Sequence, residues 1–96
     1  MRRVLGSDVT AAARALRAVP SERRAALCAR LFQEADWADR YTRRLGRVHV
    51  LWGNGTLMAA ACARRLAAEQ DFADTEYCDC FHMVISALVE RNALAA

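Results

Sequence analysis

Residues 21 to 45 read SERRAALCARLFQEADWADRYTRRL, and this stretch decides the fold. It lies between Pro20 and Gly46 and contains neither proline nor glycine, the two residue types that end helices. A seam recurs in it at spacings of four and three residues, the pattern of a helix that packs along its whole length. The seam residues are Leu27, Leu31, Glu34, Ala38, Tyr41 and Leu45. We therefore predict one helix over 21–45, about 37 Å long at ~1.5 Å per residue.

The composition extends this prediction to the whole chain. Of 96 residues, 21 are Ala, while Pro and Ile each occur once, which favours helices over strands. A chain that is 55% hydrophobic and 26% charged is typical of a folded protein, and this length suits one core. Cap and turn residues predict three shorter helices over 8–18, 57–69 and 74–92. The expected fold is a single all-α domain over 1–96, a small four-helix domain with one long central helix.

Three side chains of the long helix fit its seam poorly. Phe32 and Trp37 lie about 140° and 280° around the helix from Leu27, too far apart for one cover. We expect at least one of them to contact another chain, and therefore a homodimer through this helix. The competing expectation is that Trp37 packs under residues 47–52. Glu34 is expected at the edge of the seam, in contact with solvent, because a buried carboxylate would need an Arg or a hydrogen-bond partner.

Charge is distributed unevenly along the chain. Residues 1–48 hold 11 Arg and 5 acidic residues, whereas residues 49–96 hold 3 Arg and 6 acidic residues, and Lys is absent. A nucleic-acid-binding accessory protein, such as a transcriptional regulator or a small DNA-packaging subunit, is therefore an alternative function. It would use Arg2, Arg3, Arg14, Arg17, Arg23, Arg24, Arg43, Arg44 and Arg47. The acidic second half and the lack of a helix-turn-helix pattern disfavour it.

No motif predicts catalysis. Cys78 and His82, four residues apart, could share a helix face and form part of a structural zinc site, a weak alternative that lacks further ligands. Gly53-Asn54-Gly55-Thr56 resembles part of a phosphate cradle, but a tight turn followed by a helix N-cap explains it better. No histidine is paired with a recognisable nucleophile. We expect neither an enzyme nor a cofactor.

A cytoplasmic location is predicted from what the chain lacks. Residues 2–8 contain no apolar signal-peptide core, and the longest uncharged run, 48–63, is too short and too glycine-rich to span a membrane. We therefore expect no membrane partner. The four cysteines follow no disulfide framework, so reduced thiols are expected.

Two stretches carry a resemblance. They are Ala35-Asp36-Trp37-Ala38-Asp39-Arg40-Tyr41, and Gly46-Arg47-Val48-His49 followed by Leu51-Trp52-Gly53-Asn54-Gly55-Thr56-Leu57-Met58-Ala59-Ala60-Ala61. Through them the chain resembles a group of small uncharacterised alphaproteobacterial proteins, over about two thirds of its length. The group favours Pro after the loop histidine, where this chain has Val50. The resemblance implies a small bacterial protein and brings no established activity.

The function we predict is a non-catalytic helical protein-protein interaction module. Its partner is another protein or a second copy of the chain, and its contacts come from the long helix and the loop that follows it. The predicted interaction residues are Phe32, Trp37, Tyr41, Arg47, His49, Trp52 and Asn54.

Overall fold

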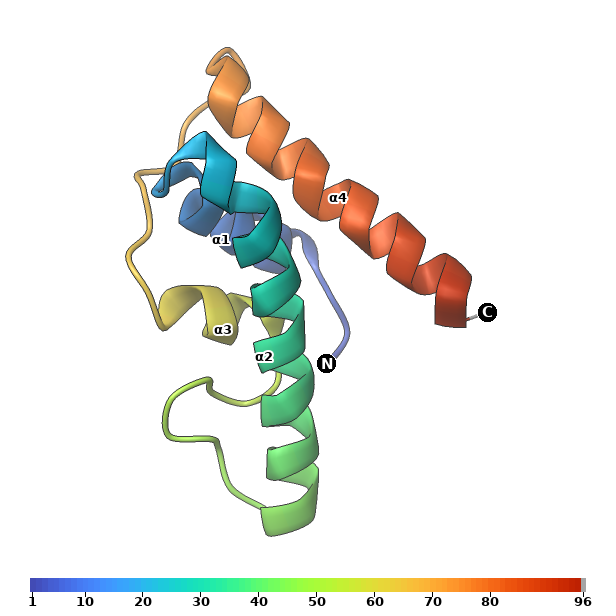
Figure 1. Ribbon diagram of the computed structural model, residues 1–96. Coiled ribbons are helices and arrows are strands. Elements are labelled where there is room, and N and C mark those ends of the chain that lie inside the picture. Colours follow the sequence, from blue (N-terminus) through green and yellow to red (C-terminus); the bar gives the residue numbers. More distant parts are fainter. Residues whose placement is uncertain (96) are drawn as a thin grey trace.

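The computed structural model describes residues 1–95, and in this range the chain forms four α-helices and no strand (Figure 1). The helices are α1 (Gly6–Arg17), α2 (Arg24–Leu45), α3 (Leu57–Cys62) and α4 (Thr75–Ala95), with one 3-10 turn, η1 (Ser21–Arg23). The all-α prediction is confirmed.

The long helix is present as predicted. Pro20 precedes η1, which leads directly into α2, and α2 continues for 22 residues without a break. It ends where Gly46 takes the left-handed conformation, with φ of 70°, and donates its N–H to the carbonyl of Thr42. Glycine suits this position because it pays no steric penalty at positive φ. Helix α2 is therefore a single unbroken helix and the longest of the four, although α1 packs more extensively against the other helices.

The core lies where α1 meets the other three helices. It is built mostly from small and aliphatic side chains, and Tyr77 is its largest fully buried residue. Its members include Val9, Ala12, Ala13 and Leu16 of α1, Leu31 and Ala35 of α2, Leu57, Ala60 and Ala61 of α3, and Tyr77, Cys80 and Val84 of α4. The seam of α2 is buried only as far as Ala38: Tyr41 is half-buried and Leu45 is 50% exposed. The expected packing along the whole of α2 is therefore wrong at its C-terminal end, where Leu45 is exposed.

The third helix is shorter than predicted. Helix α3 ends at Cys62 rather than residue 69, and the chain then runs past α1 without regular structure. Arg14 explains this, because its Nε donates to the Ala67 carbonyl at 2.7 Å while the Ala67 N–H donates to the Arg14 carbonyl at 3.1 Å. These contacts with α1 outweigh the helix preference of an Ala-rich segment.

The first helix begins at Gly6, two residues before the predicted start. Asp8 lies inside its first turn, and its carboxylate accepts hydrogen bonds from the Leu5 N–H and from the Met58 N–H at the start of α3. The buried Asp8 carboxylate thus accepts backbone hydrogen bonds at the N-terminal ends of two helices, α1 and α3.

Candidate interaction surface on the second half of α2

The loop after α2 folds back along the helix. His49 and Gly53 exchange backbone hydrogen bonds of 2.9 and 3.0 Å, which closes a tight turn. Within the turn, the His49 Nδ1 accepts hydrogen bonds from the Leu51 and Trp52 N–H groups. The histidine therefore fixes the turn from inside.

Two glycines let this loop approach the helices. Gly55 has φ of 98°, and a Cβ there would lie 2.6 Å from the Cα of Asp39 on α2. Gly53 has φ of 82°, and its Cβ would lie 2.5 Å from the Cβ of Ala59. Both the backbone conformation and the close contact require glycine. The two glycines of the Gly-Asn-Gly stretch therefore allow the loop to pack closely against α2 and α3.

The loop brings four aromatic rings together. Trp52 packs on Trp37 with ring centroids 5.3 Å apart, and His49 stacks on Trp52 at 4.7 Å. Tyr41 meets His49 edge to face, also at 4.7 Å. The guanidinium of Arg30 lies 5.2 Å from the Trp37 ring centre and 5.8 Å from that of Trp52. Trp37 is thus covered by its own chain, as the competing expectation held.

Phe32 lies on another side of α2 and takes no part in this cluster. Its side chain is 9% exposed and belongs to the core. The argument that one chain cannot cover both side chains is therefore wrong for Phe32, which the core buries, while Trp37 is half-buried with Trp52 packed against it. Self-association is a separate question that these contacts do not test.

Arginines border the aromatic cluster on its exposed side. A shallow groove of about 520 Å³ runs over the last turns of α2, lined by Trp37, Arg40, Tyr41, Arg44 and Leu45. Within residues 1–95, neither Arg40 nor Arg44 forms an ion pair. We call these five residues the α2 strip.

Two predicted interaction residues lie beside the strip. Arg47 is exposed in the loop, where its charge adds to that of the strip. Asn54 is half-buried and structural: its Oδ1 accepts from the N–H and the hydroxyl of Thr56. Thr56 in turn caps α3 by accepting from the Ala59 N–H at 3.1 Å, so the turn-and-cap interpretation of this stretch is confirmed.

Glu34 contradicts its prediction. It is 2% exposed, and its carboxylate accepts two hydrogen bonds from Arg64, at 2.7 and 2.9 Å, and one from Arg30 at 2.9 Å. Arg64 lies just beyond α3, a position that no spacing in the sequence reveals. The buried acid is therefore paired, and it orients the same Arg30 that lies against the two tryptophans.

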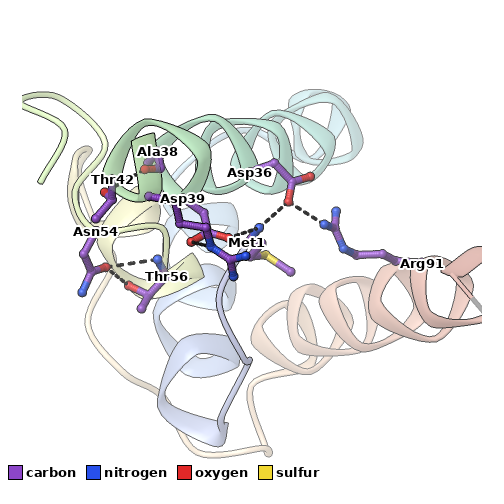
Figure 2. Close-up of polar contacts among 9 residues, drawn as sticks. Met1, Asp36, Ala38, Asp39, Thr42, Asn54, Thr56 and Arg91 are labelled. Carbon is purple, nitrogen blue, oxygen red and sulfur yellow. Dashed lines mark hydrogen bonds and ion pairs between the residues drawn. The ribbon is translucent and has the colours of Figure 1, made fainter. Parts of the chain in front are cut away.

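A second charge network joins the N-terminus, α2 and α4 (Figure 2). The Met1 ammonium donates to Asp36 at 2.7 Å and to Asp39 at 3.1 Å, and Arg91 of α4 also donates to Asp36. Burial opposes the ionisation of Asp36, but hydrogen bonds from Arg91 and the ammonium outweigh it and hold the Asp36 pKa below its usual value.

The pKa of Asp39 is lowered in the same way. Burial opposes ionisation here too, and the Met1 ammonium and Arg43 outweigh it. Arg43 lies four residues after Asp39 on the same helix, as helical spacing predicts, whereas Met1 and Arg91 come from opposite ends of the chain and no sequence pattern pointed to them.

The arginines named for nucleic-acid binding divide into two groups. Arg14 and Arg24 hold backbone carbonyls, Arg17 pairs with Asp74 and Glu76, and Arg43 pairs with Asp39. Arg2, Arg3, Arg23, Arg44 and Arg47 are exposed and form no ion pair within residues 1–95. The second group comes from both ends of α2 and the N-terminal segment, and so does not follow a single helix.

The zinc alternative gains no ligands. Cys78 and His82 are both exposed on α4, whereas Cys80 is buried. In the part of the chain that the structure describes, no three His, Cys, Asp or Glu residues lie close enough to hold a metal ion. All four cysteines are free.

These features define a class: a small all-α domain whose longest helix carries an exposed aromatic and arginine strip, supported by a loop. The chain belongs to the family described as Domain of unknown function (DUF7742), whose model matches residues 2–88. No curated protein and no solved structure matches it. Within residues 1–95, every helix is too short or too polar to cross a membrane.

Proposed function

We propose that this chain is a non-catalytic protein interaction module and that the α2 strip is its docking surface. The observation that carries the proposal is the groove over Trp37, Arg40, Tyr41, Arg44 and Leu45. Tryptophan, tyrosine and arginine are the residue types that contribute most to binding at protein interfaces. Here they lie together, partly exposed, on one regular helix.

The strip is held in place before any partner binds. Trp37 and Tyr41 are each fixed on one side by a ring of the loop, Trp52 and His49 respectively. Side chains that are already ordered lose less conformational entropy on binding, which favours affinity. The loop, which projects Val48, Val50 and Leu51 outward at 59%, 93% and 64% exposure, widens the apolar part of this surface.

The partner that fits is an amphipathic helix with acidic flanks. The strip follows the axis of α2 at spacings of three and four residues, so a second helix can lie along it. Residues 40–68 contain six arginines and no acidic residue. Because binding surfaces are complementary in charge, we expect the partner to carry negative charge. Nucleic acid is the second candidate, because Arg44 and Arg47 are exposed, but the aliphatic side chains beside them suit a protein surface better.

Site-specific cross-linking tests the proposal. A benzophenone amino acid replaces Tyr41 in the chain expressed in its native host, and illumination joins it to whatever occupies the strip. The matched control carries the same group at Phe72, an aromatic residue that is 59% exposed outside the strip. We expect a nuclease-resistant protein adduct at 41 and none at 72. An adduct that nuclease removes would favour the nucleic-acid function, and equal adducts at both positions would contradict a specific surface.

The cytoplasmic location stays part of this proposal. The four free thiols suit a reducing compartment.

A further inference from the structure

The loop after α2 presents apolar side chains to solvent at residues 48–53, which we call the loop tip. Val48, Val50 and Leu51 are 59%, 93% and 64% exposed, and Leu45 just before the loop is 50% exposed. Figure 1 shows this loop and the end of α2 projecting from the rest of the chain. Apolar side chains gathered on an exposed surface mark a contact with a protein or with a membrane. Because the loop tip projects, a flat surface as large as a bilayer can reach it.

Four backbone N–H groups of the loop tip are already paired within it. The N–H groups of His49 and Gly53 each donate to the carbonyl of the other residue, and His49 Nδ1 accepts from the Leu51 and Trp52 N–H groups. A backbone N–H group that enters an apolar medium without a partner costs free energy. The turn therefore satisfies these four groups without water, which suits the loop tip to an apolar medium.

Arginines adjoin the loop tip. Arg40, Arg44 and Arg47 are exposed and form no ion pair within residues 1–95. Residues 71–79, in contrast, hold four acidic residues, and Figure 1 shows the start of α4 at the other end of the chain's fold. An anionic surface attracts the first end and repels the second. The charge distribution therefore presents the loop tip first to such a surface.

We propose that the loop tip is a peripheral membrane contact for anionic bilayers. Val48, Val50 and Leu51 enter the boundary between headgroups and acyl chains, and the adjoining arginines bind lipid phosphates. Long arginine side chains can keep their charged ends at the headgroups while apolar neighbours insert. The sequence-based expectation of no membrane partner concerned spanning segments, which a surface contact does not need.

Other occupants fit the loop tip less well. Three aliphatic side chains on one turn bury much less than the ~800 Å² per partner of a stable protein interface. Nucleic acid would bind the arginines and leave the aliphatic side chains in water. A bilayer supplies both requirements, because its anionic headgroups lie directly above an apolar layer.

Co-sedimentation of the purified full chain with protein-free vesicles tests the proposal. We expect binding to phosphatidylethanolamine vesicles that contain about one third phosphatidylglycerol, at about millimolar lipid, and a decline with added salt. Vesicles of phosphatidylcholine alone should bind at least about tenfold more weakly. Since no protein partner is present, this result is separate from that of the Tyr41 cross-link, which tests the α2 strip.

Matched variants separate the apolar contribution from the electrostatic one. Val50→Asp should weaken binding to the anionic vesicles at least about tenfold, because a charge opposes insertion. Its control is Val89→Asp on α4, at a valine that is 64% exposed, which should bind as the wild type does. Arg47→Glu should weaken binding at least about fivefold. Its control is Arg23→Glu, which makes the same change in net charge at the exposed start of α2 and should retain binding.

Two results would overturn the proposal. The first is a chain that does not bind the anionic vesicles. The second is binding that Val50→Asp or Arg47→Glu weakens no more than its control does. Loss with Arg47→Glu but not with Val50→Asp would identify a purely electrostatic contact, as nucleic acid makes, and would exclude insertion. All four substituted positions are exposed, and far-UV circular dichroism of each variant establishes that its helices are intact.

Discussion

Glu34 and Arg64 are 30 residues apart in the chain, yet two hydrogen bonds of 2.7 and 2.9 Å join them and attach the end of α3 to the middle of α2. The carboxylate is buried and the guanidinium is mostly covered. Because Glu34 also binds Arg30, which lies over Trp37 and Trp52, this contact connects the core to the α2 strip.

The Glu34 contact should contribute measurably to stability. Replacing Arg64 with Ala leaves a buried carboxylate with only one cation, so the free energy of unfolding should fall by about 2–4 kcal/mol. The neighbouring Arg65 is exposed and forms no ion pair in the described range. Arg65→Ala should therefore change the free energy of unfolding by less than about 0.5 kcal/mol. Urea unfolding of the two variants measures both values. Equal losses in the two variants would show that the contact between Arg64 and Glu34 does not stabilise the fold.

Gly55 should tolerate substitution much less well than Gly46. Both have positive φ, but a Cβ at Gly55 meets the backbone of Asp39, whereas at Gly46 it meets nothing within 4 Å. Gly46→Ala should therefore lower the free energy of unfolding by about 1 kcal/mol, because only the left-handed backbone conformation disfavours alanine there. Gly55→Ala should cost at least about 2 kcal/mol, because the loop must also move. Thermal unfolding compares them, and similar losses would contradict the close approach of loop and helix.

His49 should rigidify the loop. In His49→Ala, the N–H groups of Leu51 and Trp52 lose their acceptor and the Trp52 ring loses its stacking partner. Amide hydrogen exchange at these two positions should become at least about tenfold faster. His82→Ala, on exposed α4, is the control and should leave both rates unchanged. Unaltered exchange in His49→Ala would mean that other contacts hold the turn.

Acid should weaken the fold partly through Asp36 and Asp39. Their pKa values are lowered in the folded state, so between the unfolded value of ~3.9 and the folded values the unfolded chain binds more protons. Their contribution is complete above ~3.9 and is lost as the pH falls through the folded values. Asp36→Asn/Asp39→Asn should therefore lower stability at neutral pH and flatten its decline in acid.

The control for this titration is Asp79→Asn. Asp79 is exposed and forms no ion pair within residues 1–95, so this variant should follow the wild-type curve. Urea unfolding from neutral pH to about pH 3 records the difference. A double variant that declines as steeply as the wild type would exclude Asp36 and Asp39 as the titrating groups.

Local signals predicted the helices well. Pro20 and Gly46 bound the central helix, and the recurring Val9, Ala12, Ala13 and Leu16 of α1 are all buried. Two of the failures share one cause, which is a partner distant in sequence. Helix α3 is short because Arg14 binds Ala67, and Glu34 is buried because Arg64 reaches it.

The candidate site was predicted in part. Trp37, Tyr41, His49 and Trp52 come together, and the loop packs on Trp37, which was the competing expectation to a contact of Phe32 or Trp37 with another chain. Two glycines make that cover possible, and their role depends on atoms of Asp39 and Ala59 that no local pattern places beside them. Asp36 lies four residues before Arg40, a spacing that favours an ion pair on a helix, but Asp36 binds Met1 and Arg91, and Arg40 lines the groove.

The most direct test of the docking surface is the yield of the Tyr41 cross-link when the charge of the strip is reversed. Arg40→Glu/Arg44→Glu is compared with Arg2→Glu/Arg3→Glu, which changes the net charge equally at exposed residues outside the strip. We expect the first variant to lose at least about nine tenths of the adduct and the second to retain it, since charge opposite a partner acts locally. Equal yields from the two variants would contradict an arginine-dependent docking surface on α2.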